Sequence, residues 1–213
     1  NPSPITAYGV FMGMKAAAHH AFGSNILEDK VIYVQGIGNV GEALVESLTN
    51  EGAKVYISDI NQERLEEVRD KYSVTIYEGD NIYSEEMDIY APCALGATIN
   101  DQTLPQLKAK VIAGAANNQL AEENRHGLLL KEKGIVYAPD FLINAGGIIN
   151  VYAELENYGK KEIIRKTENI YNTTLEILKN ADTNGVTTHQ AAFHIAQGRI
   201  DARSLKNNKK QLN

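Results

Sequence analysis

Strand signals and helix signals alternate through much of this 213-residue sequence, and this alternation is the feature that most limits its possible folds. Short apolar runs rich in Val, Ile and Tyr predict strands. The predicted strands are residues 31–34, 55–57, 74–77, 88–91, 111–113 and 135–138. Helical patterns separate most of these runs. This order predicts an α/β protein with a doubly wound parallel sheet of about six strands and helices on both faces.

The helices are predicted from their end signals. Ser3 followed by Pro4 predicts the start of the first helix, with Ser3 as its N-cap. Beyond the last predicted strand only helices are expected, and the final one should end near Arg203. Residues 204–213 form a polar segment, which we expect to be a frayed tail. We therefore predict one domain over residues 1–203 with C-terminal helices.

Composition narrows the possible partners and compartments. The chain carries 21 Lys and Arg against 27 Asp and Glu, a net charge of −6, which argues against nucleic-acid or anionic-membrane binding. Its one cysteine forms no intrachain disulfide, and no apolar run approaches the roughly 20 residues that span a bilayer. We expect a cytoplasmic protein. Because the chain begins with Asn1 and not Met, we also expect it to be part of a longer protein.

A glycine-rich turn follows the first predicted strand. The run Gly36–Gly41 has the pattern G-x-G-x-x-G between a strand and a helix, the setting in which it binds dinucleotides. Gly36 permits a tight turn, Gly38 leaves room for a diphosphate, and Gly41 allows close helix packing. Free amides and the positive helix end favour phosphate. The pattern identifies the sheet as Rossmann-type.

Asp59 ends the second predicted strand, 18 residues beyond Gly41, where an acid is expected to accept hydrogen bonds from the adenosine ribose. A 2′-phosphate beside this carboxylate would be repelled, so NAD should be preferred over NADP by at least about a hundredfold. Arg64 lies nearby and leaves weak NADP use open. The alternative is that Asp59 only caps the next helix and the glycines only form a tight turn.

Longer segments of the sequence resemble a known family. They are Ser3–Gly9, Gln35–Gly41, Ala91–Gly96, Ile112–Gln119, Tyr137–Asp140 and, most specifically, Ile143–Val151. The chain is similar to the C-terminal cofactor-binding domain of leucine, phenylalanine, valine and tryptophan dehydrogenases, in the glutamate dehydrogenase superfamily. The resemblance implies reversible, NAD-dependent oxidative deamination of a branched-chain or aromatic L-amino acid to the 2-oxo acid and ammonia. It also implies a homo-oligomeric full-length enzyme.

The resemblance also implies roles for individual residues. Thr6 would contact the nicotinamide carboxamide, residues 93–95 would line the adenosine side, and Ile148 and Val151 would form an apolar wall for the substrate. The expected cofactor-binding residues are Thr6, Gly36, Gly38, Asn39, Val40, Gly41, Asp59, Ile60, Cys93, Ala94, Leu95, Ala115, Ala116, Asn117 and Asn144. Three alternatives stay open. Cys93 could instead be a small buried residue with an apolar role. Asn144 could instead cap the helix that follows it, and Ile148 could be an ordinary core residue.

No residue of this chain is predicted to be catalytic. The Gly-rich segment with a lysine that the family uses as its base is absent, so we expect the catalytic domain to lie outside this chain and the chain to be inactive alone. No spacing of histidines predicts a metal site. One alternative is an NAD-dependent hydroxy-acid-type oxidoreductase, which would need a catalytic His and Arg near the nicotinamide. Arg125 and His126 are the only adjacent pair of these residues in the sequence, and they are expected on an outer surface. Another alternative is a non-catalytic module that senses NAD(H).

Overall fold

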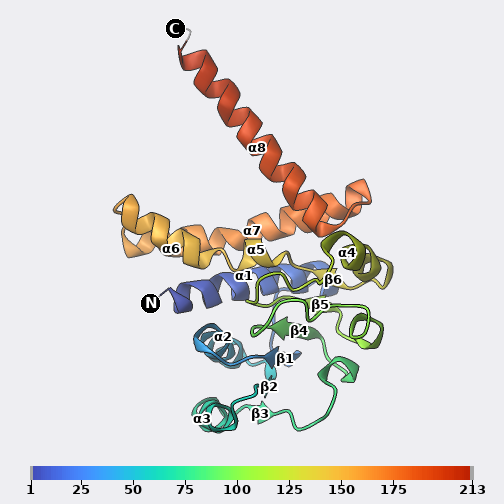
Figure 1. Cartoon of the computed structure of the whole chain (residues 1–213). Coiled ribbons are helices and arrows are strands. Elements are labelled where there is room, and N and C mark those ends of the chain that lie inside the picture. The colour runs from blue at the N-terminus through green and yellow to red at the C-terminus, as the bar shows by residue number, and fades with distance from the viewer. Residues whose placement is uncertain (1, 212–213) are drawn as a thin grey trace.

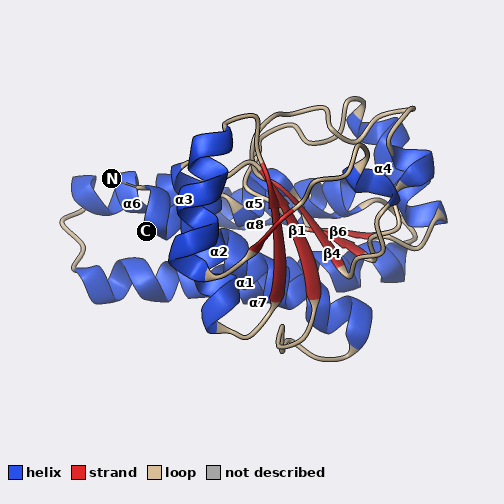
Figure 2. Cartoon of the chain, turned by 90° about the horizontal axis from the view of Figure 1, so that it is seen from below, coloured by secondary structure: helices blue, strands red, loops and turns tan. Residues whose placement is uncertain are grey.

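The computed structural model describes residues 2–211, with side chains described through Asp201. A six-stranded parallel sheet lies at its centre, with helices on both sides (Figure 2). The strands are β1 (Val31–Gln35), β2 (Lys54–Ser58), β3 (Thr75–Ile76), β4 (Ile89–Pro92), β5 (Val111–Ile112) and β6 (Val136–Tyr137). Their order is β3-β2-β1-β4-β5-β6, and every pairing is parallel. The predicted doubly wound, Rossmann-type α/β fold is confirmed.

Eight α-helices and two 3₁₀ turns complete the described chain. The helices are α1 (Ser3–Phe22), α2 (Asn39–Asn50), α3 (Gln62–Tyr72), α4 (Glu123–Glu132), α5 (Asp140–Ile143), α6 (Gly146–Leu155), α7 (Lys160–Asn184) and α8 (Thr188–Gln211), and the turns are η1 (Ile82–Ser84) and η2 (Leu104–Gln106). α1 packs against α2, β5, β6 and α7. α8 extends away from the rest of the molecule (Figure 1). No helix in the described range is long and apolar enough to cross a membrane.

Successive residues of the central strands face two different cores. Ile32 and Val34 of β1 belong to one buried cluster, which the helices α1, α2, α3 and α7 help to form. Tyr33, between them, belongs to a second cluster on the other face, with Tyr90 of β4 and Leu130 of α4. Both faces are therefore buried, which explains why the strands read as continuous apolar runs and not as an alternation of polar and apolar residues.

Two predicted helix boundaries are wrong. Pro2 and not Ser3 is the N-cap of α1, because the carbonyl of Pro2 already accepts the first helical hydrogen bond, from the amide of Thr6 at 3.0 Å. The last helix does not end near Arg203, and the predicted tail is helical as far as Gln211. No Pro or Gly interrupts this segment, and Lys and Gln are good helix formers. The final two residues of the predicted tail lie outside the described range.

Candidate cofactor site at the carboxyl edge of the sheet

The glycine turn connects β1 to α2 at the point where the strand order reverses, between β1 and β4. Gly36 has a φ of 100°, and a Cβ there would lie 2.6 Å from the amide nitrogen of Ala94, so only glycine fits. A Cβ on Gly41 would collide with the carbonyl of Gly36. At Gly38, by contrast, φ is −62° and a Cβ would meet nothing within 4 Å. The fold itself therefore does not require glycine at position 38, where the main chain is open to close approach by a ligand.

The N-terminus of α2 follows Gly38 directly. No side chain in the described part of the chain caps its first turn, so the amides around Asn39 and Val40 are available to an anion. Glu42, one turn further on, pairs with Arg64 and with Lys71, the latter at 2.9 Å. Although burial alone would raise it, the hydrogen bond from Lys71 and the charge of Arg64 hold the pKa of the Glu42 carboxyl below its usual value. Its negative charge is therefore locally neutralised.

Asp59 supports the glycine turn directly. Its Oδ2 accepts a hydrogen bond from the amide of Ile37 at 2.8 Å, and its Oδ1 accepts one from the amide of Asn61 at 3.0 Å. The cap of α3 is Asn61, whose Oδ1 accepts from the amide of Arg64 at 3.1 Å. The alternative that Asp59 only caps this helix is therefore wrong. A carboxylate offers about four acceptor positions, so Asp59 keeps acceptor capacity for a ribose.

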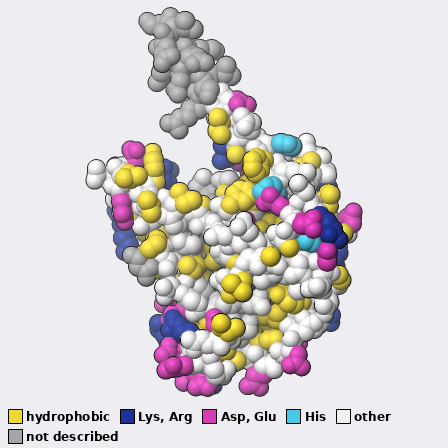
Figure 3. All heavy atoms as spheres, in the orientation of Figure 1, with side chains coloured by type: hydrophobic (Ala, Val, Ile, Leu, Met, Phe, Trp, Pro, Cys, Tyr) yellow, Lys and Arg dark blue, Asp and Glu magenta, His cyan; other side chains and the backbone are white. Residues whose placement is uncertain are grey.

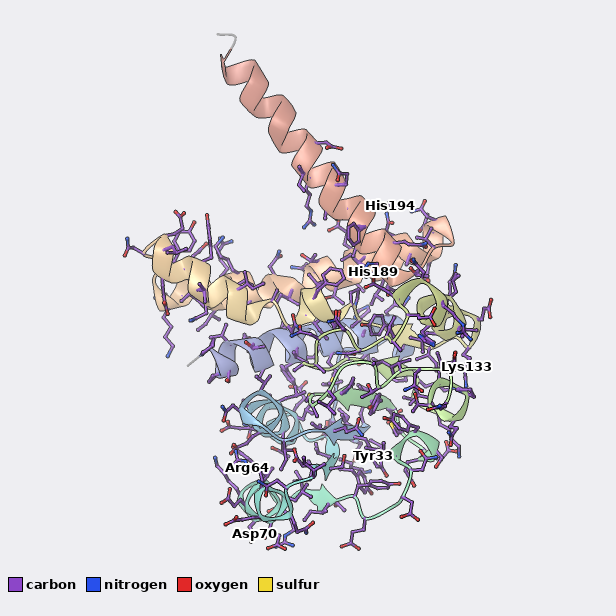
Figure 4. All side chains as sticks on the ribbon, in the orientation of Figure 1. Tyr33, Arg64, Asp70, Lys133, His189 and His194 are labelled. Atoms are coloured by element: carbon purple, nitrogen blue, oxygen red, sulfur yellow. The ribbon has the colours of Figure 1, made fainter. Side chains whose placement is uncertain are left out.

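Arg64 is engaged with carboxylates of its own neighbourhood. It lies on α3 (Figure 4). It pairs with Glu42 of α2 and, at 2.9 Å, with Glu67. The two carboxylates compensate the positive charge of this guanidinium, so its attraction for a 2′-phosphate is weakened. The observed pairs therefore weaken the case for NADP use that the sequence left open.

Exposed apolar side chains lie on both sides of the glycine turn. Ile60, after β2, is fully exposed, and Leu95, after β4, is 74% exposed. Because β2 and β4 flank β1, these two residues follow strands on opposite sides of the glycine turn. Between them Ala94 contacts the turn, and Cys93 is partly buried against the core. Burial raises the pKa of the Cys93 thiol to about 11, as expected of a small apolar residue and not of a reactive thiol.

Farther along the carboxyl edge of the sheet, residues from three separate segments lie together. Asn144, at the end of α5, donates from Nδ2 to Oδ1 of Asn117 at 2.6 Å and to the carbonyl of Ala115 at 3.4 Å. Asn144 is the C-cap of α5, while Ala145 is the N-cap of α6, so the alternative role as a cap of the next helix is wrong. A Cβ on Gly147 would lie 3.0 Å from the hydroxyl oxygen of Thr6. That hydroxyl donates a hydrogen bond to the carbonyl of Pro2.

An apolar stripe on α6 is exposed beside these residues. Ile148 is 73% exposed, which rules out the alternative that it is ordinary core, and Val151 is more than half exposed. Sequence reasoning missed two further members of the stripe, Tyr152 and Leu155. Tyr152 lies four residues after Ile148 and Leu155 four residues after Val151, and this helical spacing is the signal that would have revealed them. Hydrophobic side chains gather along this part of the surface (Figure 3).

His126 contradicts the prediction of an outer-surface Arg–His pair. Arg125 is exposed and pairs with Asp101 at 2.8 Å, but His126 is only 1% exposed. Its Nδ1 accepts from the amide of Glu122 at 2.8 Å, and its Nε2 lies 3.2 Å from Asp101. These partners are not among the predicted site residues, so the hydroxy-acid alternative gains no support. No cluster of His, Cys, Asp and Glu suited to a metal occurs among the described residues.

The strand order and the glycine turn define the class of this chain as a Rossmann-type α/β domain. A family model described as Glutamate/Leucine/Phenylalanine/Valine dehydrogenase matches residues 3–62 and 56–207. The chain belongs to this family, which confirms the resemblance seen in the sequence.

Named relatives support the same conclusion. The chain is 53% identical over 209 residues to leucine dehydrogenase of Bacillus cereus, covering 98% of this chain and 56% of that protein. It also resembles the crystal structure of L-tryptophan dehydrogenase from Nostoc punctiforme, with a TM-score of 0.91, 45% identity and coverage of 94% of this chain and 61% of that one. A hetero-hexameric glutamate dehydrogenase from Thermus thermophilus shares the fold, with a TM-score of 0.72 at 18% identity over 94% of this chain and 52% of that one. The chain thus spans little more than half the length of its named relatives.

Proposed function

We propose that this chain is the NAD-binding domain of an amino-acid dehydrogenase. The whole protein would catalyse the reversible oxidative deamination of a branched-chain or aromatic L-amino acid to the 2-oxo acid and ammonia. The observation that carries the proposal is the glycine turn at the β1–β4 switch point, where a Cβ on Gly38 would meet nothing within 4 Å. Ligands of doubly wound sheets bind at this position.

We assign the parts of NAD to successive residues along the carboxyl edge of the sheet. The diphosphate would lie on the N-terminus of α2, near Gly38, Asn39 and Val40, and the adenosine ribose would donate to Asp59. The adenine ring would lie between Ile60 and Leu95, whose exposed side chains are otherwise unexplained. When bound, NAD supplies the hydride acceptor, at its nicotinamide ring.

The residues at the nicotinamide end would orient that ring. The proposed set is Thr6, Ala115, Ala116, Asn117 and Asn144. Asn117 and Asn144 use one oxygen and one NH₂ group on each other, which leaves an NH₂ group on Asn117 and an oxygen on Asn144. One donor and one acceptor side by side suit a primary carboxamide.

The substrate class follows from the stripe on α6. Ile148 and Val151 would contact an apolar side chain, and α6 carries no Lys or Arg that would bind a second carboxylate. Burial of a leucine-sized side chain contributes about 1.5–3 kcal/mol. The names of the relatives, leucine, tryptophan and phenylalanine dehydrogenases, support the same class.

The catalytic base would lie in the part of the relatives that this chain does not span. A lysine with a lowered pKa suits the proton transfer that accompanies hydride loss, and none of the residues proposed here for cofactor binding is a lysine. The proposal therefore assigns cofactor binding to residues 1–203 and proton transfer elsewhere. We also propose that the whole protein is cytoplasmic and assembles as a homo-oligomer.

The test is an assay of the whole protein. We expect NADH absorbance to rise when NAD is supplied with leucine, phenylalanine or tryptophan, and to stay flat with glutamate or with 2-hydroxy acids. The isolated chain should give no turnover. Turnover of a 2-hydroxy acid instead would move the protein to the alternative class.

A further inference from the structure

A buried glutamine holds the loop that carries three of the proposed nicotinamide-facing residues. This loop, residues 114–118, connects β5 to the segment before α4. The side chain of Gln119 is 0% exposed. Its Nε2 donates to the carbonyl of Gly114 at 2.8 Å and to the carbonyl of Ala116 at 2.9 Å. One amide group thus spans the loop immediately before Asn117.

The orientation of this amide is determined by its partners. Both are carbonyl oxygens, so the NH₂ group must face them and Oε1 must face the other way. Oε1 has no hydrogen-bond partner among the described residues, and an unpaired buried acceptor is costly. A methionine would fill a similar volume without that cost. The amide is therefore explained by the loop geometry it sets and not by packing alone.

The main chain of Gln119 is hydrogen-bonded to the start of α5. Its amide donates to Oδ2 of the buried Asp140 at 3.1 Å, and Oδ1 of Asp140 accepts from Phe141 at 2.7 Å. Asp140 begins α5, and Asn144 ends it. Since Asn144 donates to Asn117 at 2.6 Å, the contacts form a closed ring around the loop.

We infer that Gln119 is a positioning residue that sets the direction in which Asn117 presents its amide to the nicotinamide. This inference rests on the proposed function, which assigns the nicotinamide to this part of the carboxyl edge. Gln119 itself is buried, so it would not contact the cofactor. Its effect should therefore reach only the nicotinamide half of the cofactor.

The experiment compares two ligands on one variant of the 213-residue chain. ADP-ribose contains the adenosine, the diphosphate and the second ribose of NADH, but not the nicotinamide ring. We expect the unsubstituted chain to bind NADH about tenfold more tightly than ADP-ribose, a difference of about 1.4 kcal/mol. In Gln119→Met, which keeps length and loses both donors, we expect that advantage to disappear while ADP-ribose affinity stays within about twofold.

Two further variants make the result specific. Thr167→Val removes another buried hydrogen bond, from Oγ1 to the carbonyl of Ile163 at 2.8 Å inside α7. It should leave both affinities unchanged. Gln119→Asn keeps an amide on a shorter stem that cannot reach both carbonyls, so part of the advantage of NADH should remain. If Gln119→Met fails to fold, Gln119→Asn carries the test.

The outcomes separate the two claims. An undiminished preference for NADH over ADP-ribose in the Gln119 variants would overturn the positioning role, and so would an equal loss for both ligands. If the unsubstituted chain binds neither ligand, the proposed function itself fails. Loss of the preference in Gln119→Met, but not in Thr167→Val, would establish the role.

Discussion

At the scale of single residues, Asp59 combines two tasks. Its carboxylate accepts a hydrogen bond from the amide of Ile37, which shapes the glycine turn, and it is the proposed acceptor for the adenosine ribose. The first task needs only an oxygen, whereas rejection of a 2′-phosphate needs the negative charge. Asn keeps one oxygen for the amide of Ile37 and removes the charge, although it loses the bond from the amide of Asn61, so this substitution should separate the two tasks.

Asp59→Asn is expected to improve NADPH affinity by about tenfold and to weaken NADH affinity by a few-fold. The repulsion it removes is worth about 1–4 kcal/mol at 4 Å, and a neutral acceptor binds ribose more weakly than a charged one. Fluorescence titrations with both cofactors measure the change. Asp59→Ala is the comparison, since it also removes the contact with Ile37 and should weaken both. If Asp59→Asn still rejected NADPH as strongly as before, the charge would not be the selector.

Cys93 should be unreactive near neutral pH. Burial raises the pKa of its thiol to about 11, above the ordinary value of about 8.5. The thiol is therefore neutral in the folded chain at pH 8, and labelling by iodoacetamide should be slow until the pH approaches 11 or the chain is unfolded. Because Cys93 is the sole cysteine, mass spectrometry reports on it alone. Rapid labelling of the folded chain at pH 8 would contradict its burial.

At the scale of elements, the unit of β1, turn and α2 contains two glycines with different reasons to be there. Gly36 is required by its positive φ and by the contact with Ala94, whereas the fold leaves Gly38 free to carry a side chain. The first is therefore a folding requirement and the second a binding requirement. Because both positions are glycine in the sequence motif, the motif alone does not reveal this difference.

Gly36→Ala should destabilise the chain by about 2–4 kcal/mol, because it combines a strained φ with a collision. Gly38→Ala should change stability by no more than about 1 kcal/mol and reduce NADH affinity by at least about tenfold, because its methyl group occupies the diphosphate space. Thermal unfolding and calorimetric titration check the pair. NADH affinity unchanged in Gly38→Ala would show that the diphosphate does not lie there.

The stripe on α6 leads to a prediction about the whole protein. Ile148→Ala should leave unfolding and NADH affinity unchanged, since the side chain is exposed and lies outside the proposed cofactor contacts. It should raise KM for leucine by about tenfold through lost apolar contact. Steady-state kinetics of the whole protein checks this, with exposed Leu128 of α4 as the matched control. Equal effects of Ile148→Ala and Leu128→Ala on KM would remove Ile148 from the substrate site.

At the scale of the whole molecule, the topology was predictable because strands and helices alternate and parallel crossovers follow few rules. The buried contacts were not. His126 was expected outside because helical spacing says nothing of Asp101, 25 positions away in the chain. The role of Gln119 was not predictable either, since its contact with Asp140 joins residues 21 positions apart in the chain. The end of α8 was predicted too early, near Arg203, although residues 204–211 contain no Gly or Pro that would end the helix.

The central claim is that a pyridine dinucleotide binds across the carboxyl edge of this sheet. Calorimetric titration of the 213-residue chain with NADH, repeated with NADPH, tests it most directly. The account predicts saturable binding of one NADH per chain, with NADPH weaker by at least about a hundredfold. No saturable binding at millimolar NADH, or equal affinity for both cofactors, would contradict it.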